Sequence, residues 1–228
     1  MLMETPIRSA PALRRMSVGS GNAAQPSHSL GAIEMMGSQM TFGPNEEIFG
    51  ESEQSDYVYK VVSGAVRTYK ILNDGRRQIE AFYLPGDVFG LEIGSEHQFS
   101  AEAINRTVVR MVRRSALLGL AERDCETARE LWAFAARELH QTQERMLLLV
   151  KSAPQRIASF LLEMFERLPA ADTIELPMSR QDIADYLGLT IETVSRMLTQ
   201  LVAEAKIGLP SSRRVLMHNR NALRQLNA

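Results

Sequence analysis

The sequence predicts an α+β protein in which an antiparallel β-roll is followed by a long helix and a winged helix-turn-helix. Short β-rich runs alternate with turn signals over residues 40–112, a pattern typical of a small barrel or roll. Residues 126–151 contain neither Gly nor Pro and carry an apolar repeat, which indicates one long helix. Residues 179–201 place Gly188 between two helix-cap residues, which indicates two short helices joined by a tight turn.

We divide the 228 residues into a tail (1–30), a roll (31–122), a long helix (123–151) and a C-terminal domain (152–228). The tail is rich in Ser, Gly, Ala and Pro and has no period, so we expect it to be mobile. In the roll, Asp74-Gly75 separates two β-rich runs, at 66–72 and 78–84, and is a strong hairpin signal.

The long helix carries apolar and small residues at alternating spacings of four and three, the pattern of a coiled-coil seam. These residues are Ala128, Trp132, Ala135, Leu139, Thr142, Met146 and Leu149. At 1.5 Å per residue the helix is about 39 Å long, more than a small roll needs. We therefore favour a homodimer seam, and packing of the helix on its own domain remains the alternative.

Composition excludes several classes of protein. A hydrophobic content of 45% with 23% charged residues is ordinary for a globular chain. The single Cys125 excludes a disulfide framework and any multi-cysteine metal site. Apolar runs reach only about five residues, too few to span a membrane, and no apolar segment follows Arg14 and Arg15 as in a secretory signal. We expect a cytoplasmic protein without a membrane partner.

Cys125 itself has two interpretations. A redox switch needs an accessible thiolate, which the neighbouring Asp124 and Glu126 disfavour. A small, buried, apolar residue is the interpretation that we favour.

The helix-turn-helix begins with a capping box formed by Ser179 and Asp182. Thr190 is the expected N-cap of the second helix, whose buried face carries Val194 and Leu198. The residues expected to read base edges are Ile191, Glu192, Ser195 and Arg196. The residues expected to hold phosphates are Ser179, Arg180, Thr190, Arg213 and Arg214, the last two in a wing loop. An ordinary helical hairpin is the alternative.

Charge supports double-stranded DNA as the partner of this end of the chain. The whole sequence has a net charge of -1, which excludes a uniformly basic coat. Residues 191–228 nevertheless hold six basic residues against two acidic ones, a net of +4.

Residues 179–196 resemble the helix-turn-helix signature of the CRP/FNR family of bacterial transcription regulators. The resemblance covers residues 35–225, and Glu192-x-x-Ser195-Arg196 is similar to the DNA-reading motif of the FixK-like and FNR-like branch. It implies a dimeric activator with a cyclic-nucleotide-binding-like roll, acting at TTGA-N6-TCAA palindromes and recruiting RNA polymerase. The polymerase contact implied for the roll comprises Gln78, Glu80, Phe82, Pro85 and Asp87, and a simple hairpin edge is its alternative.

Residues that bind ligands or cofactors in other members of the family are missing from this sequence. Residues 95–100 lack the Arg that holds a cyclic phosphate and include Glu96, so we expect no cyclic-nucleotide response. Residues 1–40 lack the cysteines of an iron–sulfur sensor. We therefore predict no cofactor. The alternative is a ligand-gated regulator that binds an unidentified small molecule, or haem through His97 or His140.

Two further expectations follow. Metal dioxygenases also use small barrels but need clustered His and carboxylate ligands, and the roll holds only His97, so we expect no enzyme. Ala205 stands near where the family usually has Gly, and a left-handed turn there would be strained.

Overall fold

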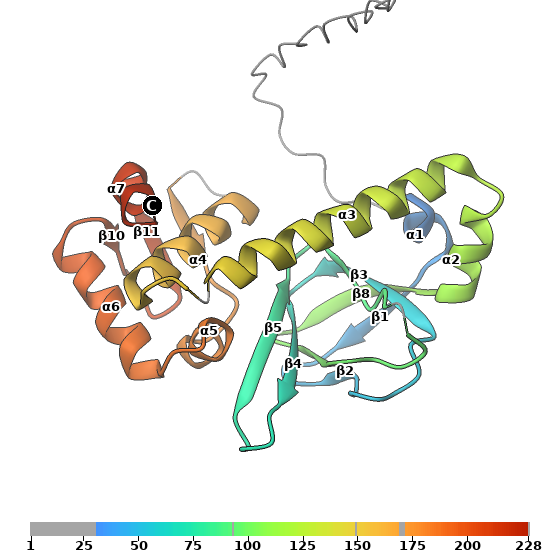
Figure 1. Cartoon of the computed structure of the whole chain (residues 1–228), viewed down its shortest axis with the longest axis horizontal. Helices are drawn as coiled ribbons and strands as arrows, with labels where there is room; N and C mark the ends of the chain where they lie inside the picture. Colours follow the sequence, from blue (N-terminus) through green and yellow to red (C-terminus); the bar gives the residue numbers. More distant parts are fainter. Residues whose placement is uncertain (1–30, 93, 149, 169–171, 228) are drawn as a thin grey trace, which may run out of the picture.

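A computed structural model describes residues 31–92, 94–148, 150–168 and 172–227, and it confirms the predicted α+β fold. The expected mobile tail (1–30) and Leu149 of the seam lie outside the described residues. Figure 1 shows the long helix running along the roll and ending beside the C-terminal domain. None of the described helices is both long and apolar enough to cross a membrane.

The roll consists of a short helix, α1 (Gly31–Met36), and two antiparallel sheets. In order across the first sheet, the strands are β1 (Ser38–Phe42), β8 (Thr107–Arg113), β3 (Tyr57–Ser63) and β6 (Val88–Phe89). In order across the second, they are β2 (Glu47–Phe49), β7 (Ser100–Ala103), β4 (Val66–Ile71) and β5 (Arg77–Tyr83). The predicted hairpin joins β4 to β5, and Gly75 adopts the positive φ of 82° that its turn requires.

The helices follow the roll in the predicted order. They are α2 (Arg114–Ala121), α3 (Cys125–Leu148), α4 (Ala153–Arg167), α5 (Arg180–Leu187), α6 (Ile191–Ala203) and α7 (Arg220–Asn227). A small sheet of β9 (Thr173–Glu175), β11 (Arg214–Met217) and β10 (Ile207–Gly208) completes the winged domain. Helix α7, whose Leu223 is fully buried, was not predicted from the sequence.

One apolar core joins the roll to the winged domain. Phe82 of β5 lies 5.1 Å from the ring of Tyr186 in α5 and 6.3 Å from that of Phe160 in α4. Ile79 and Leu84 of the roll belong to the same buried cluster. The C-terminal domain is therefore packed directly against the second sheet, which the sequence did not indicate.

Cys125 is exposed at the first residue of α3, so the expectation that it is buried is wrong. The reason is local. The Asp124 side chain caps the helix by accepting a hydrogen bond from the Thr127 amide at 2.9 Å, and Thr127 faces inward. Cys125, in the first turn, faces solvent.

Ala205 adopts a φ of 52° directly after α6, as the sequence suggested. We expect Ala205→Gly to raise the free energy of unfolding by up to about 1 kcal/mol, because glycine tolerates this conformation. Denaturant titration measures the change. The control Ala136→Gly, on the exposed surface of α3, should instead lower stability by roughly 0.5–1 kcal/mol. A loss of stability in Ala205→Gly would show that the turn is not strained.

Candidate nucleic-acid interface

The first helix of the interface begins with the predicted capping box. The Ser179 hydroxyl accepts a hydrogen bond from the Asp182 amide at 3.1 Å, and the Asp182 carboxylate accepts one from the Ser179 amide at 2.9 Å. The helix ends at Gly188, whose φ of 63° lets the chain turn. Ser179 and Arg180 are both only partly exposed.

The second helix, α6, presents a polar face to solvent. Thr190 caps it by accepting a hydrogen bond from the Thr193 amide at 3.2 Å. Val194, Leu198 and Leu201 are buried on its inner face. Glu192 and Arg196 are exposed one turn apart, and neither forms an ion pair with another described residue. Both side chains are therefore available to an external partner.

The other predicted base-reading residues lie on the same helix. Ile191 is 36% exposed at its first position. Ser195 is partly exposed, and its hydroxyl lies 3.4 Å from a guanidinium nitrogen of Arg180. Arg180 thus lies against the recognition helix rather than extending freely into solvent.

The wing carries its two arginines on the surface. Arg213 donates a hydrogen bond to the Pro177 carbonyl at 3.2 Å, and Arg214 lies 3.9 Å from the Glu175 carboxylate. Because all these charged side chains are exposed, such contacts contribute little stability. The structure therefore places Arg213 beside the start of α5 and Arg214 beside β9.

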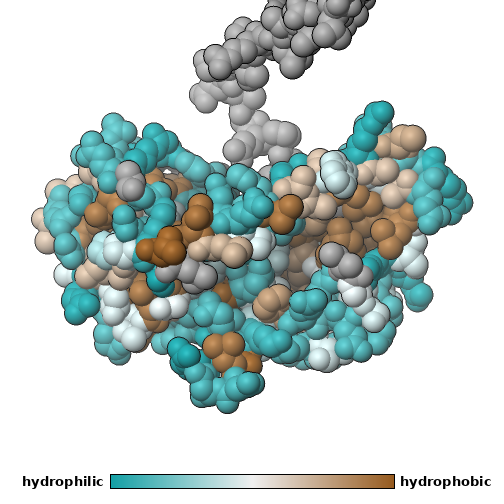
Figure 2. All heavy atoms as spheres, in the orientation of Figure 1, coloured by the Kyte–Doolittle hydropathy of each residue, from teal (hydrophilic) through white to brown (hydrophobic). Residues whose placement is uncertain are grey.

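The predicted seam residues of α3 that the structure describes are all exposed in the single chain. Trp132 is 77% exposed, Leu139 61% and Met146 63%, with the smaller Ala135 and Thr142 between them. Phe134 of the same helix is buried against the roll. Figure 2 shows hydrophobic side chains along the course of α3. The helix therefore packs on its own domain with one face and leaves the repeat uncovered.

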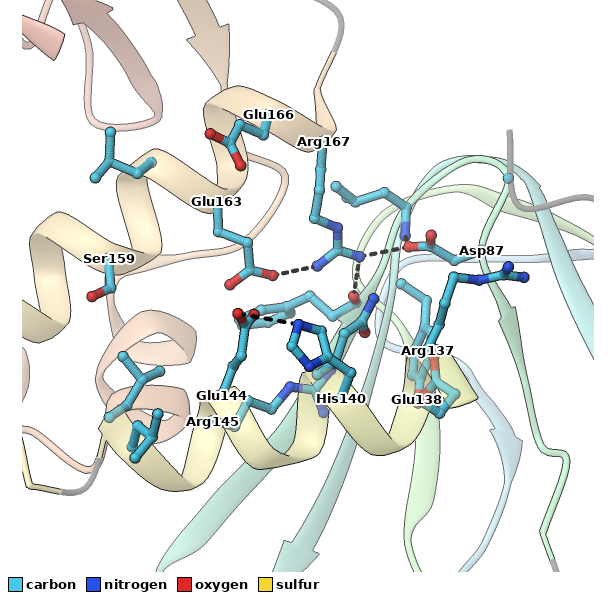
Figure 3. A pocket seen from close by; sticks show the side chains of 18 of the residues that line it. Asp87, Arg137, Glu138, His140, Glu144, Arg145, Ser159, Glu163, Glu166 and Arg167 are labelled. Atoms are coloured by element: carbon cyan, nitrogen blue, oxygen red, sulfur yellow. Dashed lines mark hydrogen bonds and ion pairs between the residues drawn. The ribbon is translucent and has the colours of Figure 1, made fainter. Parts of the chain in front are cut away.

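The residues predicted to contact polymerase lie between the roll and the helices. Glu80 forms an ion pair with Arg145 of α3 at 2.7 Å, and Asp87 forms one with Arg167 of α4 at 2.6 Å. Figure 3 shows Arg167 between Asp87 and Glu163. Phe82 is buried, Gln78 is partly buried, and Pro85 is exposed. These contacts join domains, whereas the fully exposed part of the hairpin is its tip, residues 71–76.

The pKa values of two partly buried groups in this joint are shifted, for different reasons. Burial lowers the pKa of the Arg167 guanidinium, but the carboxylates of Asp87 and Glu163 outweigh it, so the pKa is raised. Burial raises the pKa of the Tyr186 hydroxyl to about 12, with Glu163 adding to the effect. The arginine therefore remains charged and the tyrosine neutral at physiological pH.

The roll interior holds the histidine considered as a haem ligand. His97 is buried, stacks on Phe49 at 3.6 Å between ring centroids, and lies 3.0 Å from the Glu92 carboxylate. His140 is exposed on α3, 3.5 Å from Glu144. Among the described residues, no three His, Cys, Asp or Glu side chains are grouped as a metal site.

A group of contacts around Asp182 was not predicted from the sequence. Its second carboxylate oxygen accepts hydrogen bonds from Arg67 and Arg77 of the roll. These partners are more than a hundred residues away along the chain, so no local pattern could reveal them. Asp182 was identified only as a helix cap.

Comparison with known proteins agrees with this architecture. Residues 155–226 match a Crp-like helix-turn-helix domain, and residues 39–124 match a cyclic nucleotide-binding domain. The structure of FixK2 from Bradyrhizobium japonicum superposes with a TM-score of 0.82 at 52% identity, covering 85% of this chain and 98% of that one.

Two sequence relatives agree with it too. The nitrogen fixation regulation protein FixK of Azorhizobium caulinodans is 48% identical over 217 residues, which are 92% of this chain and 86% of that protein. FixK of Rhizobium meliloti is 42% identical over 200 residues, 86% of this chain and 92% of that protein.

The fold and the exposed recognition helix define a DNA-binding transcription regulator of the winged helix-turn-helix class. The chain belongs to the CRP/FNR family, in its FixK-like branch. The resemblance inferred from residues 179–196 is thereby confirmed.

Proposed function

We propose that the chain is a transcriptional activator that binds, as a homodimer, inverted repeats of the form TTGA-N6-TCAA. The observation that carries this proposal is the exposed pair of Glu192 and Arg196, one turn apart near the start of α6. Arg can donate two hydrogen bonds to O6 and N7 of guanine, and Glu can accept one from N4 of cytosine. Together the two side chains suit the G·C pair of the half-site and its neighbour.

The remaining contacts set affinity and register. Ile191 has no polar group and suits a thymine methyl, while Ser195 suits a thymine or a phosphate. Phosphates are assigned to the five residues at the helix caps and in the wing, Ser179, Arg180, Thr190, Arg213 and Arg214. Half-site centres about ten base pairs apart match one turn of DNA and therefore a two-fold dimer.

Sequencing of genomic fragments that the purified protein retains tests the operator. An enriched inverted TTGA motif is expected. The Arg196→Ala protein, which keeps the fold and the wing, is the matched control and should enrich a motif without the conserved G. Enrichment of an unrelated motif by the unmodified protein would contradict the assignment.

In the proposed function the protein uses no cyclic-nucleotide effector and no cofactor, and it catalyses no reaction. A bound cyclic phosphate would need a bidentate cationic partner, and residues 95–100 offer none. Glu96 is exposed in this stretch, and His97 turns inward onto Phe49.

Calorimetry with cAMP and cGMP is therefore expected to detect no binding tighter than about millimolar, which corresponds to roughly 4 kcal/mol. A micromolar site, together with ligand-dependent DNA affinity, would favour the ligand-gated alternative.

RNA polymerase remains the proposed protein partner. Of the five residues assigned to this contact, Pro85 is the exposed one. The proposal that the chain recruits RNA polymerase is therefore supported by the family to which the chain belongs. The exposed tip of the β4–β5 hairpin, residues 71–76, offers a larger surface than Pro85 alone.

A further inference from the structure

The first turn of α5 is tied to the roll through one carboxylate. One oxygen of Asp182 accepts hydrogen bonds from the Ser179 amide and hydroxyl, at 2.9 and 2.8 Å. The other oxygen accepts from Arg67 of β4 at 3.1 Å and from Arg77 of β5 at 2.7 Å. The same side chain therefore caps the DNA-contacting helix and joins it to the second sheet.

Two of the three side chains in this contact are buried, and the third, Arg77, is 24% exposed. The side chain of Asp182 is 4% exposed and that of Arg67 is 8% exposed. Arg67 also pairs with Glu102 at 3.0 Å and donates to Asn45 at 3.1 Å. Buried ion pairs are favourable when each charge is hydrogen-bonded in this way, and the planar guanidinium fixes their direction.

Arg77 extends the contact by one helical turn. Its Nε donates a hydrogen bond to Asp185 at 2.8 Å, so that one arginine binds two carboxylates of α5. Burial lowers the pKa of Arg77, but the carboxylates of Asp185 and Asp182 outweigh it and raise the pKa. Arg77 is therefore charged throughout the physiological range.

We propose that Arg67, Arg77 and Asp182 form a clamp that holds the helix-turn-helix in the orientation that binds DNA. The shared apolar core attaches the two domains, but apolar contact is non-directional, whereas the clamp fixes where α5 begins. While the clamp is closed, Glu192, Arg196 and both wing arginines are exposed. The closed joint is therefore compatible with DNA, and these three residues are positioning residues.

All three residues of the clamp belong to the same chain, so the clamp sets this orientation from within the protein. This inference rests on the proposed function for its DNA readout alone. If Arg77 is removed, the winged domain samples other orientations, and the apparent affinity falls in proportion to the fraction of molecules that remain able to bind DNA.

The test compares two arginines of one hairpin. Arg77→Gln breaks the clamp. The control Arg76→Gln removes the same charge from a residue whose side chain is 77% exposed and which pairs with Asp74. Spin labels at Ser63→Cys in the roll and Ser212→Cys in the wing, in a Cys125→Ser background, report the distance between the domains. Dilution with unlabelled protein keeps most pairs of labels within one chain.

We expect one narrow distance distribution for the unmodified protein and for Arg76→Gln. Arg77→Gln should broaden it and weaken operator binding about tenfold at fixed salt, against less than about twofold for the control. The salt dependence of binding should stay the same, because the clamp contacts no phosphate. Arg67→Lys, which keeps the charge but loses the fork, should show the same effects.

An unchanged distribution and unchanged affinity in both clamp variants would overturn the inference. Tighter DNA binding in Arg77→Gln would also overturn it, because the clamp would then hold the domain away from DNA. If the unmodified protein failed to prefer TTGA sites, the operator assignment would be wrong. The distance measurement would still show whether the clamp fixes the orientation of the winged domain.

Discussion

Leu139→Asp is expected to convert the protein to monomers and to abolish specific DNA binding at nanomolar concentration. Leu139 is 61% exposed in the single chain at the centre of the seam, between Ala135 and Thr142. In a dimer it would be buried against the partner's seam, where an unpaired carboxylate is costly to desolvate. A monomer engages one half-site, so the gain of about 10²–10⁴ from linking two sites is lost.

Sedimentation without DNA, at micromolar protein, measures the change in assembly, and binding to the full palindrome measures the consequence. The matched control is Gln141→Asp, an exposed residue of α3 that lies neither at the repeat positions nor at the e and g positions that flank them, and this variant should remain dimeric. An unmodified protein that sediments as a monomer would show that the seam does not form the interface.

The elements of the fold could be predicted because their signals are local. The capping box at Ser179, the turn at Gly188 and the cap at Thr190 each depend on residues within four positions, and the structure contains all three. The long helix was predicted from its spacing and from the absence of Gly and Pro, and α3 extends over Cys125–Leu148.

The arrangement of the domains could not be predicted in the same way. Phe82 was assigned to a contact with polymerase, yet its ring packs on Tyr186, which lies about a hundred residues further along the chain. Asp87 and Glu80 likewise form ion pairs with α4 and α3. Such pairings depend on tertiary packing, which a single sequence does not encode at any fixed spacing.

Arg196→Ala is expected to cost about 1–3 kcal/mol of operator binding and to relax the preference at the G of TTGA. Arg196 is exposed and forms no ion pair with another described residue, so its removal breaks no ion pair among them. The free energy of unfolding should therefore change by less than about 0.5 kcal/mol. Any loss of affinity then reports on DNA alone.

Arg213→Ala supplies the contrast within the same domain. Arg213 is exposed in the wing and donates to the Pro177 carbonyl, beside the start of α5. A phosphate contact carries no sequence information, so this change should weaken all sites alike. It should also reduce the slope of log affinity against log salt by about one.

The measurement is a binding titration over every single-base variant of the half-site, at fixed salt and then at several salt concentrations. The two arginines differ in position: Arg196 lies on the exposed face of α6, one turn beyond Glu192, whereas Arg213 lies in the loop before β11. Removal of a base-reading residue changes the order of affinities among the single-base variants. Removal of a phosphate contact lowers the affinity for all variants by the same factor. Equal weakening of all variants by Arg196→Ala would show that Arg196 contacts phosphate, and a changed preference at the G in Arg213→Ala would move the reading of that base from α6 to the wing.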